Sequence, residues 1–326
     1  MALSFSLKTI VCYGDLVADL VMQIPRLPIL PDQAQLARSL VVEPGGAGNF
    51  LITAARLGGR CVALAAVGED PNGETIHAIM QAENIDMGYA QRGAGSTNVI
   101  VIVFVDDAGQ HVFIAHDGTG APFAIGSREA ELIREVGVFY MPGYSLAEGR
   151  MAPAALEAMH IAHKAGVAIM NDLGPVVNDG PVRDAAIEVV RHSHVSLLTA
   201  HEAMQFTGES NYESAANALL QMGSKAVVIK RGPQGCVVFD GASAREVPGL
   251  VVPARDTTAA GDSFAGGFVV DWLKHGDVFC AAQFANAVAA AKVQKIGSGR
   301  QCPTAAEVEA MLRAMSGESR VKTLDS

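Results

Sequence analysis

The sequence predicts an α/β fold built on a mostly parallel β-sheet with helices on both faces. Between residues 130 and 250, short apolar runs typical of buried strands alternate with longer runs of helical periodicity. Strands separated by helices pair in parallel, because each connection crosses a face of the sheet. Residues 20–42 and 97–115 are β-rich and contain several turn residues, so they predict a second, smaller sheet. We expect one α/β domain over residues 1–316 and a polar tail at 317–326.

The alternation can be followed along the chain. Thr9–Tyr13 is a short apolar run that predicts a buried strand ending at Gly14-Asp15, and residues 62–67 predict a second one. Asp106-Asp107-Ala108-Gly109 predicts a hairpin turn inside the smaller sheet. Further on, strands are expected at Val136–Met141, Val167–Asn171, Val195–Leu198, Ala226–Ile229 and, opening a hairpin, Cys236–Asp240, and helices at Ala152–Ala165, Val182–Arg191 and Glu213–Met222.

Composition limits the possible functions. Half of the 326 residues are hydrophobic and only 18% are charged, which permits a large core. The net charge of −10 argues against nucleic acid or an anionic membrane as the main partner. The five cysteines include no Cys-x-x-Cys pair, so we expect reduced thiols. No apolar run approaches the length of a membrane span, and no signal peptide is evident, so we expect a cytoplasmic protein.

The most informative stretch is Asp256-Thr257-Thr258-Ala259-Ala260-Gly261-Asp262-Ser263-Phe264. It follows a strand-like run, Leu250–Pro253, and opens a predicted helix that carries Phe264, Phe268 and Trp272 on one face. Small residues allow a tight turn there, and the free N–H groups of the first helical turn would then attract an anion. A carboxylate beside that anion suits a base that deprotonates a hydroxyl attacking a phosphate. Taken alone, Asp262 could equally be an ordinary N-cap.

The whole stretch resembles the C-terminal signature of the ribokinase-like (PfkB) carbohydrate kinases, Asp-Thr-x-Gly-Ala-Gly-Asp. Ala259 stands where many members carry Gly. Gly45-Gly46-Ala47-Gly48-Asn49 resembles the N-terminal Gly-Gly-x-x-Asn signature of the family, and Gly14 with Asp19 fits its Gly-x-x-x-x-Asp spacing. The resemblance extends from Gly14 to Pro303.

The resemblance implies a three-layer ribokinase-like sandwich with the small sheet as a lid. It also implies transfer of the ATP γ-phosphoryl group to a hydroxymethyl group of a sugar. Asp262 would be the base, and the amides of residues 259–262, which are Ala259, Ala260, Gly261 and Asp262, would form the anion hole. Asp19, Gly45, Gly46 and Asn49 would bind the sugar. Val17 replaces an Asn that contacts sugar in ribokinases, so the acceptor need not be ribose.

The nucleotide would be held without a P-loop or a Gly-x-Gly-x-x-Gly motif, since the chain has neither. The resemblance assigns ATP contacts to Lys230, Gly232, Gly235 and Asn286. It assigns Glu202 to Mg²⁺ through water, although Thr199 replaces the Asn of the family pattern. Asp256 and Thr258 match positions that supply oxygens to a monovalent cation such as K⁺, with further carbonyls expected at 292–297.

Two further readings of the function remain open: an adenosine-like nucleoside kinase, and a paralogue that binds sugar or nucleotide without turnover. The sugar-side motifs carry no cation for a second phosphate, which favours an unphosphorylated sugar over a sugar phosphate, although Arg26 and Arg38 of the lid could reach the site. Residues 99–105 are apolar on both faces of the predicted strand, so we expect a homodimer in which two lids cover one another.

Overall fold

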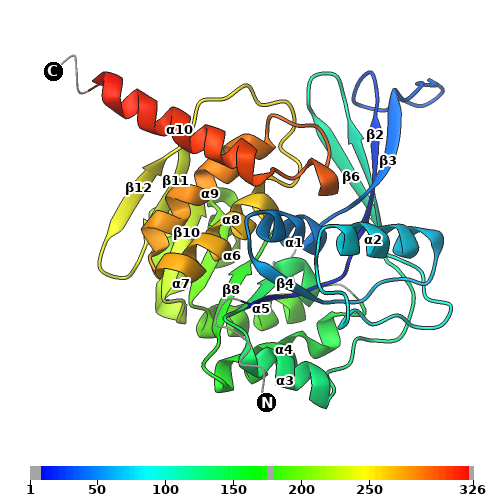
Figure 1. Ribbon diagram of the computed structural model, residues 1–326, viewed down its shortest axis with the longest axis horizontal. Coiled ribbons are helices and arrows are strands. Elements are labelled where there is room, and N and C mark those ends of the chain that lie inside the picture. The colour runs from blue at the N-terminus through cyan, green and yellow to red at the C-terminus, as the bar shows by residue number, and fades with distance from the viewer. Residues whose placement is uncertain (1–8, 148, 175–179, 323–326) are drawn as a thin grey trace.

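A mostly parallel sheet forms the centre of the molecule (Figure 1). The structure is a computed structural model that describes residues 9–147, 149–174 and 180–322, with side chains of the last helix up to residue 314. The first eight residues and the last four, which belong to the predicted domain and tail, lie outside the described residues. In spatial order the strands are β12 (Ala244–Pro248), β11 (Gly235–Phe239), β10 (Ala226–Lys230), β9 (Val195–Thr199), β8 (Ala168–Asp172), β7 (Val138–Pro142), β1 (Thr9–Tyr13) and β4 (Arg60–Leu64).

All neighbouring strands from β10 to β4 pair in parallel, and only β11 and β12 add an antiparallel hairpin at one edge. Strands β1, β7, β8 and β11 are buried along their whole length. This burial on both faces explains why they are continuous apolar runs in the sequence instead of alternating ones. The predicted sheet is confirmed.

Two helical layers cover the sheet and complete the predicted three-layer sandwich (Figure 1). One core cluster joins the sheet to α1 (Ala47–Arg56), α2 (Pro71–Ala82), α8 (Ala260–His275), α9 (Val278–Lys292) and α10 (Ala305–Lys322). The other joins it to α3 (Ser127–Glu135), α4 (Ala152–Lys164), α5 (Gly180–His192), α6 (Ala200–Thr207) and α7 (Tyr212–Met222). Three short 3₁₀ segments, η1 (Gly143–Leu146), η2 (Gly232–Gln234) and η3 (Gly299–Gln301), complete the described elements.

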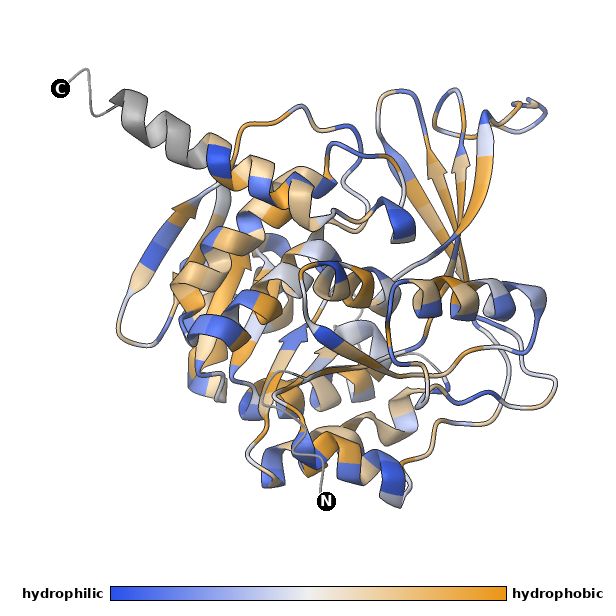
Figure 2. Ribbon diagram, in the orientation of Figure 1, coloured by the Kyte–Doolittle hydropathy of each residue, from blue (hydrophilic) through white to orange (hydrophobic). Residues whose placement is uncertain are grey.

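The predicted lid is a separate four-stranded sheet in the order β3 (Ser39–Pro44), β2 (Ala18–Gln23), β5 (Ile100–Val105) and β6 (His111–His116). The Asp106–Gly109 turn joins its last two strands, closed by a bond from the Gly109 N–H to the Asp106 carbonyl of 3.0 Å. On one face, Val103 and Val105 are buried with Val21 against Ile296. Figure 2 shows these strands as predominantly hydrophobic.

Two details of the prediction differ from the structure. Leu250–Pro253 forms no strand, and Val251 is fully exposed at 103%. The segment follows β12, the edge strand of the sheet, and Pro253 has no N–H to donate to a ladder. At the C-terminus, α10 runs to Lys322, well into the stretch predicted as a polar tail from residue 317.

The aromatic face predicted for the helix after Asp262 is confirmed on α8. Phe264 and Phe268 are 3% and 0% exposed, and Trp272 packs against the same core cluster. We therefore expect Phe268→Ala to lower the free energy of unfolding by about 3–5 kcal/mol, because it deletes a buried ring and leaves a cavity. Denaturant titration would measure this. The matched control Val251→Ala, at an exposed site, should change the free energy by less than about 0.5 kcal/mol. Equal effects of the two substitutions would contradict the assigned packing.

Candidate active site

The start of α8 is the centre of the site. Ala259 precedes the helix with φ 60° and ψ 11°, a left-handed conformation that costs a residue other than glycine about 1 kcal/mol. No side chain caps this helix. The Ala260 N–H donates to the Thr257 carbonyl, and the Ser263 N–H donates to the Ala259 carbonyl. The N–H groups of Gly261 and Asp262, between them, have no backbone acceptor among the described residues. These two residues are partly exposed, so their N–H groups are available to the kind of anion that the sequence predicts at this helix start.

Asn49 links this helix start to the N-terminal glycine motif. Its side-chain Nδ2 donates to Asp262 Oδ2 at 2.9 Å, and its Oδ1 accepts from the N–H of Gly299 at 2.7 Å. The bond from Gly299 orients the amide, because the oxygen must face that donor and the nitrogen must face the carboxylate. Three segments far apart in the sequence therefore meet at Asp262: the first turn of α1, the first turn of α8, and η3.

Asp19 and the paired glycines lie together, as the sequence predicted. Asp19 is buried on lid strand β2, and a Cβ at Gly45 would lie only 2.1 Å from Asp19 Oδ1, so a larger residue at position 45 would displace the Asp19 carboxyl group. Gly46, with φ 48°, is the residue that precedes α1. Glu43, which the sequence analysis missed, is buried on β3 and accepts from Arg300 Nη2 at 2.9 Å. It therefore ties the lid to η3.

Two carboxyl groups of the site, those of Asp19 and Asp262, have raised pKa values. Burial is the main cause that raises the pKa of Asp19 to about 7; the Ser298 hydroxyl opposes it, while Asp262 and Glu43 add to it. Burial also raises the pKa of Asp262, against the lowering effects of the Asn49 hydrogen bond and of the ammonium groups of Lys230 and Lys292. A carboxylate with a raised pKa is a stronger base, and strongly perturbed carboxyl groups gather at functional sites.

Lys230 brings a positive charge to the same place. Its Nζ lies 2.5 Å from Asp172 Oδ2, and a Cβ at Gly261 would lie 3.4 Å from that Nζ. Burial disfavours the charged ammonium, but Asp172 and Glu202 outweigh it and raise the pKa of Lys230. Burial raises the pKa of Asp172 to about 6, against the pull of Lys230. Asp172 was missed in the sequence; its signal is its position at the carboxyl end of parallel strand β8, where ligands bind in α/β sheets.

The other residues predicted to hold nucleotide and Mg²⁺ have mixed roles. Glu202 forms a capping box with Thr199, whose N–H donates to Glu202 Oε2 at 2.7 Å. The negative charge of Glu202 also raises the pKa of both Lys230 and Asp172. Gly232 is exposed in η2. Asn286 has a structural role as well, because its Nδ2 donates to the carbonyls of Val247 and Pro248 at 3.1 and 3.2 Å.

Gly235 serves the hairpin rather than an open ligand site. It is buried at the start of β11 with φ 88°, and a Cβ there would lie 2.1 Å from the Val247 carbonyl.

The chemistry of Glu202 and Asp172, two carboxylates beside a lysine, fits Mg²⁺, which prefers oxygen ligands and retains water.

The two residues predicted for a monovalent cation are buried next to the helix start. The Asp256 carboxylate accepts from the N–H groups of Thr258 and Gly297 at 2.8 and 2.7 Å. Thr258 Oγ1 is buried without a hydrogen-bond partner among the described residues. The Asp256 carbonyl lies 3.5 Å from the ammonium of Lys292, a fully buried residue that the sequence analysis placed only at the edge of the expected site.

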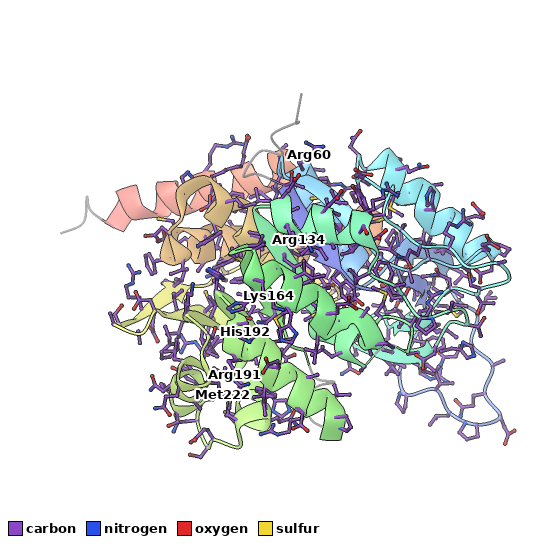
Figure 3. All side chains as sticks on the ribbon, turned by 90° about the horizontal axis from the view of Figure 1, so that it is seen from below. Arg60, Arg134, Lys164, Arg191, His192 and Met222 are labelled. Atoms are coloured by element: carbon purple, nitrogen blue, oxygen red, sulfur yellow. The ribbon has the colours of Figure 1, made fainter. Side chains whose placement is uncertain are left out.

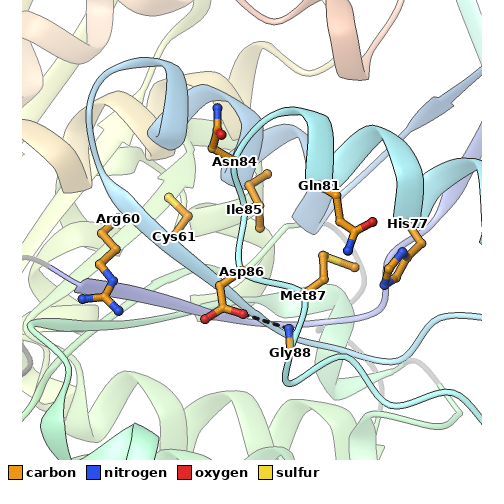
Figure 4. A pocket seen from close by; sticks show the side chains of 9 residues that line it. All are labelled: Arg60, Cys61, His77, Gln81, Asn84, Ile85, Asp86, Met87 and Gly88. Carbon is orange, nitrogen blue, oxygen red and sulfur yellow. Dashed lines mark hydrogen bonds between the residues drawn. The ribbon is translucent and has the colours of Figure 1, made fainter.

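Two other clusters lie at the opposite, amino-terminal edge of the sheet. An open cavity of about 650 Å³ surrounds Arg60 and Asp86 near the start of β4 (Figure 4). His192, which Figure 3 labels, contacts Glu188 Oε1 at 3.0 Å, and His160 contacts the same oxygen at 3.2 Å. Neither cluster contains a residue predicted to act on phosphate or sugar. None of the described helices has the length and apolarity required to cross a bilayer.

Comparison with known proteins agrees with this geometry. Residues 7–305 match the model of the pfkB family carbohydrate kinases. The chain is 28% identical over 294 residues to an ATP-dependent ribose-1-phosphate kinase of Halopiger xanaduensis, covering 90% of this chain and 94% of that protein. It is 25% identical over 311 residues to the ribokinase of Haemophilus influenzae, covering 92% and 97% of the two chains.

A similar solved structure is a putative ribokinase II of E. coli in complex with ATP and Mg²⁺, with a TM-score of 0.82 at 22% identity over 94% of this chain and 99% of that one. The similarity shows a shared fold. Together with the match over residues 7–305, it shows that the chain belongs to the pfkB family of carbohydrate kinases.

Proposed function

We propose that this protein transfers the γ-phosphoryl group of ATP to a hydroxymethyl group of an unphosphorylated sugar, with Asp262 as the base. Membership in the family makes the chain a phosphotransferase with an alcohol group as acceptor. One observation carries the finer proposal: Asp262 lies at the start of α8 between residues proposed for the two substrates. Asn49, proposed to bind the sugar, donates a hydrogen bond to it, and the ammonium of Lys230, proposed to bind the phosphates, lowers its pKa.

In this reaction, Asp262 accepts the proton of the hydroxymethyl group as its oxygen attacks the γ-phosphorus. The bond from that phosphorus to the bridging oxygen of ADP breaks, and ADP leaves with the bond's electron pair. The amides of Gly261 and Asp262, with that of Ala259 in the same turn, stabilise charge on the transferring group. The Ala260 N–H, which the sequence placed in the same anion hole, donates instead to the Thr257 carbonyl at 3.1 Å. The raised pKa of Asp262 favours proton capture, and the nearby Lys230 ammonium opposes that rise in part.

ATP and Mg²⁺ are the proposed cofactors. Mg²⁺ would neutralise charge between the phosphates, and Glu202 and Asp172 are the carboxylates placed to hold it through water. Lys230 would contact the phosphates directly once ATP competes with Asp172 for its ammonium. Gly232 and Asn286 lie on the elements that would border the nucleoside. The E. coli relative solved with ATP and Mg²⁺ supports this choice of cofactors.

The acceptor is proposed to lack a phosphate because the nearby guanidinium groups are already engaged. Arg300 donates to both oxygens of Glu43, and Arg38 forms an ion pair with Asp107. Arg26 donates to Gln33 at 2.6 Å on the exposed edge of the lid. The Asp19 carboxyl group, together with the second N–H of the Asn49 amide, suits hydroxyl groups.

A substrate panel tests the proposal. Release of ADP would be measured with ATP, Mg²⁺ and either free pentoses and hexoses, ribose 1-phosphate, or adenosine and related nucleosides. Turnover of a free sugar is expected. A clear preference for ribose 1-phosphate or for a nucleoside would replace the proposed acceptor. Binding of sugar or ATP without any turnover would instead identify a non-catalytic binding protein.

Assembly is proposed to be a homodimer through the lid. On the lid face opposite Val103, Leu40 on β3 and Ile114 and Val112 on β6 are exposed by 56%, 54% and 43%. Their cross-strand partners Met22, Ile102 and Phe104 lie between them on β2 and β5. Such a contiguous apolar face usually has a partner, and two copies of one sheet satisfy a two-fold axis.

The first prediction of this proposal concerns the dimer. Ile102→Lys should produce monomers at micromolar concentration and raise the KM for the sugar, because it places a charge in the centre of that face and loosens the lid. Light scattering coupled to gel filtration would measure the mass. Val251→Lys, at an exposed site outside the lid, is the matched control and should leave the dimer intact. A wild-type monomer at micromolar concentration would refute the dimer.

The second prediction concerns the base. Asp262→Asn should lower kcat by roughly 10²–10⁴, the usual contribution of a general base, while folding and ATP binding persist. The amide is nearly isosteric, so the hydrogen bond with Asn49 can be kept by rotation of the side chain. A coupled assay for ADP would measure turnover, and calorimetry would measure ATP binding. Near-normal turnover would remove Asp262 from the mechanism.

The third prediction concerns Asp19. Its pKa is about 7 in the folded protein, above the ordinary 3.8, so its ionised form destabilises the free enzyme above pH 7. That cost fades as the pH falls from 7 towards 4, because the folded protein then takes up the proton. Asp19→Asn should therefore raise the Tm more at pH 8 than at pH 5. It should also weaken sugar binding by about 1–3 kcal/mol, while ATP binding stays unchanged.

The control for Asp19 is Asp184→Asn, which removes the same charge from the exposed surface of α5. Its Tm change should be small and the same at both pH values. Equal loss of sugar and ATP binding in Asp19→Asn would indicate a folding defect and contradict a role for Asp19 in the sugar site.

A further inference from the structure

Lys292 has an unusual environment for a lysine. It is the last residue of α9 and is 0% exposed, although lysine is rarely buried completely. Both of its side-chain hydrogen bonds among the described residues go to backbone carbonyl oxygens: Lys295 O at 3.1 Å and Asp256 O at 3.5 Å. A buried ammonium must be compensated by such groups, because its transfer from water is costly. Burial still lowers the pKa of the ammonium, and the neighbouring Asp256 carboxylate opposes this effect only in part. The two carbonyls accept its hydrogen bonds.

The same carbonyls belong to the segments expected to bind K⁺. The family resemblance places a monovalent cation among the oxygens of Asp256, Thr258 and residues 292–297, and the ammonium is bonded to one carbonyl from each segment. Ammonium and K⁺ carry the same charge and prefer the same carbonyl ligands. The residues present therefore do not fit a bound K⁺, because a second cation at these oxygens would meet the charge of Lys292 at close range.

The position of Lys292 connects it to the anion hole. Asp256 and Thr258 immediately precede the turn that opens α8, and the Asp256 carboxylate also holds the Gly297 N–H at 2.7 Å. Lys292 thus joins the loop before α8 to the loop after α9. Its charge also acts on Asp262, where it favours the ionised carboxylate.

We propose that the Lys292 ammonium takes the place of a monovalent cation in this protein, which makes its activity independent of K⁺. Lys292 is a positioning residue in this role, since it acts through the loop that carries the anion hole and does not touch the reacting atoms. The predicted effect on kcat rests on the proposed kinase function. The predicted effect of K⁺ on the Tm does not, because it is measured without a substrate.

The test compares K⁺ with other cations in the wild type and in Lys292→Met, which removes the charge and keeps the length of the chain. Thermal unfolding is followed at constant ionic strength in KCl, NaCl and choline chloride, with free sugar and ATP absent. The wild type should show the same Tm in all three salts. Lys292→Met should have a lower Tm in choline chloride and recover part of the loss in KCl, because K⁺ can then occupy the vacated carbonyls.

In the kinase assay, KCl should change the wild-type kcat by less than about twofold. Lys292→Met should lose roughly tenfold or more in kcat, as expected when a charge that supports an anion hole is removed, and KCl should restore part of it. Lys292→Gln serves as a second uncharged variant if the Met variant does not fold. Lys164→Met, at an exposed position on α4, is the control and should match the wild type in every salt.

The outcomes separate this proposal from the kinase proposal. A K⁺-specific rise in the Tm or the kcat of the wild type would overturn it, and that measurement needs no variant. A folded Lys292→Met protein with unchanged Tm and no response to KCl would also overturn it. If no substrate is phosphorylated but the salt-dependent Tm pattern appears, the cation substitution stands and only the proposed reaction fails.

Discussion

The site depends on keeping several carboxylates in a small buried volume without unfolding the protein around them. Asp262, Asp19 and Asp172 each have a pKa raised by burial, and Asp262 adds to the shift of both of the others. Such a cluster costs stability, because like charges repel strongly where water is excluded. It persists because Lys230 and Lys292 supply opposite charge and Asn49 supplies a hydrogen bond. The continuous cores on both faces of the sheet offset the remaining cost.

This electrostatic arrangement also couples the lid to the base. Asp19 lies on lid strand β2, whereas Asp262 lies on α8 in the main domain. Glu43 on β3 binds Arg300 of η3, and the adjacent residue Gly299 holds the Asn49 amide that contacts Asp262. A displacement of the lid would therefore change both the charges near Asp262 and the amide that orients it. In a kinase, this coupling suits a site that must exclude water before the proton is transferred.

The contrast between Asn49 and Asn286 shows why a motif residue is judged by its contacts. Both were expected to touch a ligand, and both use their Nδ2 within the protein. Asn49 donates to a carboxylate that faces the site, so a ligand hydroxyl can join the same network. Asn286 donates to two carbonyls of the β12 hairpin end, so its main effect is to hold α9 against that hairpin.

The sequence by itself determined the architecture and supplied most of the candidate residues of the site. Alternating apolar runs and helical periods predicted the parallel sheet, and β-rich segments predicted the lid, because these patterns are local and directly reflect burial. The 256–264 stretch and the paired glycines identified Asp262 and Asn49 as candidates. Only the tertiary structure decided that Asn49 contacts Asp262, across 213 residues of chain, and that Asp172 pairs with Lys230. It also decided that the Lys292 ammonium lies where oxygens for K⁺ were expected. These contacts depend on how strand ends and helix starts meet in space, and no local pattern along the chain encodes which distant side chain will neutralise a buried charge.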